Sequence, residues 1–332
     1  MNKIKRFIQT YRLNHLIIPN EGNYQTHYFN KIGVAKYCDV APIILSSDRK
    51  TIEPKDYAAL KPFDLVYVTT SALPEWFETV YPRLLREGIR IFLVTGDAIN
   101  SAPNAILSQV SSASLEQIIS DGIILHWFTQ NCDAPEHELM TPIPLGLDYH
   151  TLNRRKMWGE KRTPYLEQDQ ALIRLADNQR NPKAWQNKNP NVLVDFHHSL
   201  HANATDRNRA FEASKMLSGT KLLPARISRS QYWKAVRECQ FVLSSIGAGT
   251  DCHRTWEAIV LGAVPIIRRT SISSLFEGLP IIEVNSYEEL SDEMLQNYIY
   301  PDTLTEEAEQ RLTLRYWLEV IDETKRRIAC TA

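Results

Sequence analysis

The sequence predicts an α/β protein built from two doubly wound, Rossmann-like units, each a parallel sheet covered by helices. Continuous apolar, β-rich runs alternate with helix-like stretches in both halves of the chain, a pattern typical of parallel sheets buried on both faces. The length of 332 residues favours two domains. A composition with 43% hydrophobic and 23% charged residues excludes a disordered or collagen-like chain.

The first predicted unit spans residues 1–150. Its expected strands are the apolar runs His15–Pro19, Ala41–Ser46, Phe63–Thr69, Arg90–Thr95, Gly122–Phe128 and Thr141–Leu147. Helix-like stretches such as Pro74–Arg86 separate several of them. Residues 151–190 are polar and rich in helix-breaking residues, so they predict an interdomain segment.

The alternation restarts in a second predicted unit over residues 191–303. Its expected strands are Asn191–Phe196, Cys239–Ser245, Val264–Ile267 and Pro280–Val284. Its expected helices are Thr205–Leu217, Gln231–Arg237, Asp251–Leu261 and Glu288–Gln296. Residues 304–332 predict a long C-terminal helix, Thr305–Arg327, that packs back across the domains.

Charge and cysteine usage exclude several function classes. A formal net charge of -1 disfavours a nucleic-acid-binding protein, which usually carries a basic face. The five cysteines are widely spaced and form no C-x-x-C pair, as expected for reduced thiols in the cytoplasm. Neither a secretory leader nor 18 consecutive apolar residues occur, so we expect a cytoplasmic protein with at most peripheral contact with the inner face of a membrane.

The segment Phe241–Arg269 carries the strongest functional signal. An apolar strand leads into a loop of small residues that contains Gly247, Gly249 and Thr250, and a helix is expected to begin at Asp251. Glycines let the backbone approach a ligand, and the free N–H groups and dipole of the helix N-terminus attract anions. The segment therefore predicts an anion site, with Asp251 or Thr250 as the helix cap.

Two basic residues, His253 and Arg254, lie in the first turn of this predicted helix. A cation at a helix N-terminus is electrostatically unfavourable unless an anion binds there, and a guanidinium can donate charge-assisted hydrogen bonds to phosphate. Glu257 follows one turn later, where it can accept from ribose hydroxyls or pair with Arg254. Trp256 is expected in the core. The segment is neither a dinucleotide fingerprint nor a P-loop.

These residues resemble a known family. The run Gly247-x-Gly249-Thr250, then Arg254-x-Trp256-Glu257 and Gly262-Ala263-Val264-Pro265, is similar to the nucleotide-sugar-binding region of exostosin-like (GT47-type) glycosyltransferases, including their ribitol xylosyltransferase branch. Weaker similarity covers Arg226-x-Ser228-Arg229-x-x-Tyr232-Trp233 and Ile143–Asp148.

The resemblance implies a GT-B fold, in which two Rossmann-like domains face each other across a cleft. It implies a hexosyl- or pentosyltransferase that moves a sugar, with inversion, from a nucleotide-sugar donor to a glycan or lipid-linked glycan acceptor in surface polysaccharide synthesis. Residues matching Arg254 and Glu257 would hold the donor phosphate and ribose. A GT-B nucleotide-sugar epimerase and a non-catalytic nucleotide-sugar-binding protein remain alternatives.

No metal or other cofactor is expected. The chain contains no D-x-D pair, which single-domain glycosyltransferases use to hold a divalent cation on the donor diphosphate. The charge would instead be met by Arg254, the helix N-terminus and further arginines, for which Arg209, Arg226 and Arg229 are the candidates. The histidines His197, His198 and His201 either bind a metal or contact the donor phosphate.

An inverting transfer needs a base for the acceptor hydroxyl, expected at the carboxyl end of a strand in the first unit. Asp97 follows the strand Arg90–Thr95, although a role in a turn competes with a role in catalysis. His126 and Asp133 are the reserve candidates. Around a later strand end lie Trp127, Gln130 and Asn131, a mixture of ring and amides that suits acceptor binding.

Overall fold

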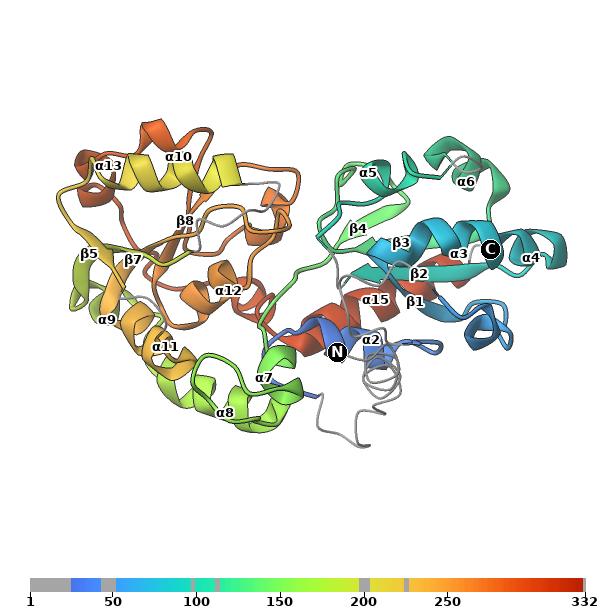
Figure 1. The fold of residues 1–332 in the computed structure, drawn as a ribbon, viewed down its shortest axis with the longest axis horizontal. Coiled ribbons are helices and arrows are strands. Elements are labelled where there is room, and N and C mark those ends of the chain that lie inside the picture. The colour runs from blue at the N-terminus through green and yellow to red at the C-terminus, as the bar shows by residue number, and fades with distance from the viewer. Residues whose placement is uncertain are drawn as a thin grey trace, which may run out of the picture. The chain divides into compact units, whose positions relative to one another are not determined.

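The computed structural model describes residues 25–42, 52–96, 99–110, 114–196, 204–223 and 227–330. The chain divides into two compact units. Unit 1 comprises Met1–Gln25, Lys31–Ile143 and Leu318–Ala332, and unit 2 comprises Thr26–Asn30 and Pro144–Trp317. Each unit is a parallel sheet with helices, so the predicted fold class of two Rossmann-like α/β units in one chain is confirmed (Figure 1).

Unit 1 contains a four-stranded parallel sheet in the order β1-β2-β3-β4. Its strands are β1 (Leu65–Thr69), β2 (Ile91–Gly96), β3 (Ile124–Thr129) and β4 (Met140–Pro142). Every residue of β1 and β2 is buried, which explains why these strands are continuous apolar runs rather than alternating ones. The described helices are α2 (Lys31–Tyr37), α3 (Leu73–Thr79), α4 (Tyr81–Glu87), α5 (Asn104–Leu107) and α6 (Leu115–Asp121).

Three predicted elements of unit 1 change or fall outside the structure. The run His15–Pro19 lies outside the described residues, and so does most of Ala41–Ser46. The expected strand Thr141–Leu147 shortens to β4, and the chain then turns through left-handed Gly146 (φ 65°). Just before the second of these runs, Val40 forms a parallel bridge with Val66 of β1.

Unit 2 contains a five-stranded parallel sheet in the order β6-β5-β7-β8-β9. Its strands are β5 (Asn189–Val194), β6 (Thr220–Leu222), β7 (Cys239–Leu243), β8 (Val264–Arg268) and β9 (Ile282–Val284). Helices connect them, and the buried core includes Val192, Phe241, Val264 and Tyr287. The strand order reverses at β5. The next strand in sequence, β6, pairs with one edge of β5, and the following strand, β7, pairs with the other edge.

The helices of unit 2 include three that lie within the predicted interdomain segment 151–190 or at its start. These are α7 (His150–Arg154), α8 (Tyr165–Ala176) and α9 (Pro182–Gln186). The connections between strands are α10 (Ala204–Ser214), α11 (Arg229–Glu238) and α12 (His253–Val260). After β9 follow the short 3-10 helix η4 (Tyr287–Glu289), α13 (Asp292–Gln296), α14 (Glu306–Gln310) and α15 (Leu314–Ala329).

The long helix predicted over Thr305–Arg327 is divided into α14 and α15. The backbone N–H of Phe29 donates to the carbonyl of Leu312, and the N–H of Leu314 donates to the carbonyl of His27. This antiparallel pairing with residues 26–30 engages the backbone between the two helices, so one continuous helix cannot form there. The second of them, α15, contributes its first residues to unit 2 and the rest to unit 1.

None of the helices formed by the described residues has the length and apolar character needed to cross a membrane.

Candidate functional site

The reversal of strand order in unit 2 defines the place where a ligand is expected. In doubly wound sheets, ligands bind outside the carboxyl ends of the strands at the point where the order reverses. Here β5 is followed by Asp195 and Phe196, and β7 by the loop of residues 244–251. Helix α12 begins next to both, at His253. The segment identified from sequence therefore lies at the switch point of the sheet.

The start of α12 differs from the prediction. Its N-cap residue is Cys252, and no side chain caps the helix. Asp251 instead turns inward, where its carboxylate accepts hydrogen bonds from the backbone N–H of Leu145 (2.7 Å) and the indole N–H of Trp256 (2.9 Å). Trp256 is 1% exposed, as expected of a core residue. The N–H groups of the first helical turn are thus left without a side-chain cap.

The glycine loop packs closely against the start of α12. The N–H of Gly247 donates to the carbonyl of Gly249 (3.1 Å). A Cβ atom at Gly247 would lie 2.8 Å from Sγ of Cys252 and 3.3 Å from a guanidinium nitrogen of Arg207. A Cβ atom at this position would therefore displace the side chain of Cys252. Gly249 and Thr250 form a half-buried bend beside it.

Three residues in or near this segment carry a buried polar atom without a hydrogen-bond partner among the described residues: Nη1 of Arg254, the hydroxyl of Tyr232 and Oγ of Ser245. The Nε of Arg254 donates to the carbonyl of Asp195 (3.0 Å), and its guanidinium lies 5.5 Å from the ring centre of Phe196. Each unsatisfied buried group costs about 1–3 kcal/mol. A ligand oxygen next to Nη1 of Arg254 would satisfy that donor.

A second guanidinium, that of Arg207 in α10, lies beside the same loop. Its Nε donates to the carbonyl of Ile246 (3.2 Å). Burial and the nearby positive charge of Arg254 lower the pKa of Arg207. Two like charges held close together favour an anion between them. Arg207 was not predicted, because it belongs to another helix and no local motif marks it.

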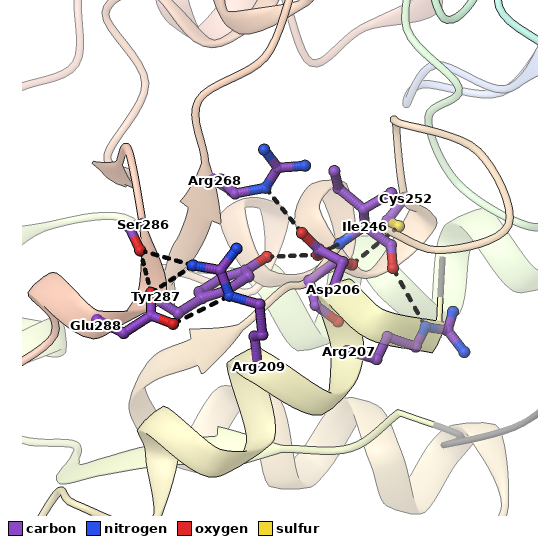
Figure 2. Close-up of polar contacts among 10 residues, drawn as sticks. Asp206, Arg207, Arg209, Ile246, Cys252, Arg268, Ser286, Tyr287 and Glu288 are labelled. Atoms are coloured by element: carbon purple, nitrogen blue, oxygen red, sulfur yellow. Dashed lines mark hydrogen bonds and ion pairs between the residues drawn. The ribbon is translucent and has the colours of Figure 1, made fainter. Parts of the chain in front are cut away.

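Asp206 fixes the loop to the rest of the sheet, as Figure 2 shows. Its carboxylate accepts from the N–H of Ile246 (3.1 Å), Nε of Arg268 (2.8 Å) and the hydroxyl of Tyr287 (2.9 Å). The three partners come from the glycine loop, β8 and η4. The loop is therefore held in place before any ligand binds.

Arg209 is not directed at the loop. Its guanidinium forms an exposed ion pair with Glu288 at 2.9 Å and also donates to Ser286 (Figure 2). Arg229 is buried, and its Nη1 donates to the backbone carbonyl of Asp148 and to Oε1 of Gln168. We therefore assign both arginines to protein contacts rather than to donor phosphate. Arg226, like His197, His198 and His201, lies outside the described residues.

Glu257 is 7% exposed, and its Oε1 accepts from the indole N–H of Trp233 in α11 (2.9 Å). It forms no ion pair with Arg254. Burial raises the pKa of Glu257, and the nearby charge of Arg229 opposes this shift. The in-helix ion pair considered from sequence is therefore replaced by a contact with a neighbouring helix.

His253 forms a second cluster on the same turn of α12. Its Nδ1 lies 2.5 Å from the carbonyl of Gly146, and its ring centre lies 5.9 Å from that of His150. Nδ1 of His150 lies 2.7 Å from Oδ1 of Asp148, and a guanidinium nitrogen of Arg229 lies 3.3 Å from Oδ2. Ligand atoms of Asp148, His150 and His253 lie within 4.8 Å of one another. Arg229 already balances the carboxylate, which disfavours a cation.

The candidate bases of unit 1 have structural partners. His126 is 3% exposed, and its Nε2 lies 2.8 Å from Oγ1 of Thr141. Asp133 accepts from the N–H groups of Asn104 (2.9 Å) and Ala105 (2.8 Å) at the start of α5. Asp97 lies outside the described residues. We therefore assign His126 to the core and Asp133 to the end of a helix rather than to catalysis.

The residues expected to bind the acceptor are also buried. Trp127 is fully buried, and its indole N–H donates to Oγ1 of Thr95 (2.8 Å). Gln130 and Asn131 are each 2% exposed. We assign all three to the core of unit 1, because none offers an exposed face for a sugar.

The chain shows distant similarity to solved structures. A trehalose 6-phosphate synthase from Burkholderia multivorans is 14% identical, with a TM-score of 0.45, over 84% of this chain and 75% of that one. AviGT4, a glycosyltransferase involved in avilamycin A biosynthesis, is 10% identical with a TM-score of 0.35, over 86% and 93%. A UDP-GlcNAc 2-epimerase from Methanocaldococcus jannaschii is also 10% identical with a TM-score of 0.35, over 78% and 75%.

No curated protein matches the chain in sequence. Residues 220–324 match the RXYLT1 C-terminal domain. The matched segment contains α11, β7, the glycine loop and α12, and so carries Tyr232, Ser245 and Arg254. The resemblance predicted from sequence is confirmed over these residues, which are similar to the RXYLT1 C-terminal domain.

Proposed function

We propose that this protein is a glycosyltransferase whose unit 2 binds the diphosphate of a nucleotide sugar at the β5/β7 switch point. The sugar passes, with inversion, to a glycan or lipid-linked glycan acceptor in surface polysaccharide synthesis. The observation that carries the proposal is the buried Nη1 of Arg254 in the first turn of α12, which has no hydrogen-bond partner among the described residues, as is also true of the hydroxyls of Tyr232 and Ser245. A phosphate supplies the acceptor oxygen that the Arg254 donor lacks.

The charges at the switch point fit a leaving diphosphate. Arg207 and Arg254 supply two guanidinium groups, and the first turn of α12 supplies N–H groups without a side-chain cap. Preorganised positive charge of this kind stabilises a departing anion without a metal ion. In this proposal the Oε2 atom of Glu257 accepts from a ribose hydroxyl, since Oε1 is occupied by Trp233.

The test is thermal stabilisation of the protein by UDP, GDP, CMP and their sugar conjugates, each with and without EDTA. A ligand at 100 times its dissociation constant adds about 2.7 kcal/mol to the free energy of unfolding. We expect one nucleotide class to stabilise the protein, and EDTA to leave the effect unchanged. Stabilisation by none of these nucleotides would overturn the proposal.

The residue assignment is tested with Arg254→Ala, for which we expect a loss of about 10–100-fold in nucleotide affinity, the equivalent of one charge-assisted hydrogen bond. Arg269→Ala is the matched control, because it removes the same charge from an exposed ion pair with Glu283 in the same unit. Equal affinities of the two variants would contradict the assignment. NMR of the sugar nucleotide without an acceptor would reveal an epimerase instead.

A further inference from the structure

We propose that His150, oriented by Asp148, is the base that accepts the proton of the attacking hydroxyl. This inference rests on the proposed glycosyltransferase function and deepens it, because none of the bases expected from sequence is available in the described part of unit 1. His126 is buried against Thr141, and Asp133 is bonded to two backbone N–H groups.

The contact between His150 and Asp148 fixes the imidazole. Nδ1 of His150 lies 2.7 Å from Oδ1 of Asp148, so the charge of the carboxylate holds the ring at this position. The carboxylate is itself held, because it accepts from the N–H of Thr151 (3.0 Å) and pairs with Arg229 at 3.3 Å. An imidazole oriented by a fixed carboxylate is the arrangement of a general base.

Charged groups from three elements face this pair. Asp148 and His150 belong to the loop and first turn of α7, His253 and Glu257 to α12, and Arg229 to α11. Burial acts to raise the pKa of Asp148, but His150, His253 and Arg229 together hold it well below its usual range. Asp148 is therefore ionised at neutral pH.

The pair lies beside the proposed donor site. His253 precedes Arg254 in the first turn of α12, and its ring centre is 5.9 Å from that of His150. The side chain of His150 is 18% exposed, so solvent or a substrate hydroxyl can reach it. The first turn of α12 thus carries both Arg254, which is proposed to bind the diphosphate, and His253, which lies next to His150.

In the proposed step, proton transfer to His150 accompanies cleavage of the sugar–phosphate bond. The acceptor oxygen forms a bond to the anomeric carbon while its proton passes to Nε2 of His150. The bond from that carbon to the phosphate oxygen breaks, and its electron pair leaves with the nucleoside diphosphate. The imidazolium then loses its proton to solvent, which restores the neutral ring.

The experiment measures cleavage of the UDP- or GDP-sugar that stabilises the wild type most, with water as the acceptor. For His150→Ala we expect turnover to fall by about 10²–10⁴-fold, the usual contribution of a general base, while the affinity for UDP or GDP stays unchanged. Added imidazole should restore part of the lost turnover. His137→Ala, at a partly buried histidine of unit 1, is the matched control and should keep wild-type turnover.

The role of Asp148 as a positioning residue is tested by separating the effects on kcat and on KM. Asp148→Asn removes the charge that holds the ring, so kcat should fall while the affinity for UDP or GDP stays unchanged. Asp148→Glu keeps the charge and should restore part of kcat. Unchanged turnover in His150→Ala, or a parallel loss of nucleotide affinity without rescue by imidazole, would overturn the inference. Failure of the wild type to bind any nucleotide would instead refute the proposed function.

Discussion

His126 is an ionisable residue that the fold keeps neutral. It lies in β3 with 3% of its surface exposed, and Thr141 is the partner of its Nε2. Burial, together with the positive charge of Arg327, lowers the pKa of His126 to about 4. An imidazole with this pKa is a weak base at neutral pH, which agrees with its assignment to the core.

This burial has a consequence for stability that depends on pH. In the unfolded chain the pKa of a histidine is about 6.5, so between pH 6.5 and about 4 the unfolded state binds a proton that the folded state excludes. The free energy of unfolding should therefore fall as the pH falls through this window, by on the order of 3 kcal/mol from this one residue.

The contribution is isolated with His126→Gln. This variant should lose less stability than the wild type between pH 6.5 and 4 in urea titrations, because it has no imidazole to protonate. Parallel curves for the wild type and His126→Gln would show that His126 does not set this dependence.

Among the elements, the buried strands could be predicted from sequence and the exposed ones could not. β1, β2, β7 and β8 are apolar because both faces of each are covered. β6, with the sequence Thr220-Lys221-Leu222, was missed because this edge strand is three residues long and has no fully buried residue.

The candidate site was predictable where one segment carries it and not where separate elements do. Arg254 could be identified because a cation in the first turn of a helix is a local misfit. Arg207 comes from α10, and nothing in its sequence neighbourhood connects it with the segment Phe241–Arg269. The same holds for His150, whose partners Arg229 and His253 lie far along the chain.

Gly146 is a position where the connection into unit 2 requires glycine. Its φ of 65° is left-handed, and a Cβ atom there would overlap the ring and the carbonyl oxygen of Phe29. Gly159 has a similar φ of 72°, but a Cβ atom there would meet nothing within 4 Å. The two glycines therefore separate backbone strain from steric overlap.

We expect Gly159→Ala to lower the free energy of unfolding by about 1–2 kcal/mol, the cost of a left-handed L-residue. Gly146→Ala should lose about 1–3 kcal/mol more, because the overlap with Phe29 adds an overpacking cost. Urea denaturation followed by circular dichroism measures both losses. Equal losses would mean that the backbone around Phe29 shifts freely to accept the methyl group.

At the scale of the whole molecule, neither unit is a single stretch of chain. Unit 2 takes Thr26–Asn30 from near the N-terminus, and unit 1 takes Leu318–Ala332 from the C-terminus. A short-range sequence pattern detects the elements of each unit but not this exchange of segments, because the pairing of residues 26–30 with Gly146 and Thr313 spans more than 100 residues.

The part of α15 that belongs to unit 1 is bound to it by several contacts. Ile321 is fully buried, and Asp322 accepts from the hydroxyl of Tyr37 (2.6 Å). Lys325 pairs with Asp39 (3.4 Å), and its ammonium lies 5.7 Å from the ring centre of Phe92 in β2. Burial of an isoleucine side chain alone contributes about 1.5–3 kcal/mol.

A chain that stops after Trp317 should therefore destabilise unit 1, although the deleted residues follow the last residue of unit 2. In hydrogen exchange, the amides of β1 and β2 should exchange faster than in the wild type, while those of β7 and β8 keep their protection. A chain that stops after Ala329 keeps Ile321, Asp322 and Lys325 and is the matched control. If β1 and β2 are protected equally in both truncated chains, α15 does not stabilise unit 1. Residues 318–329 would then lie against unit 1 without adding to its free energy of unfolding.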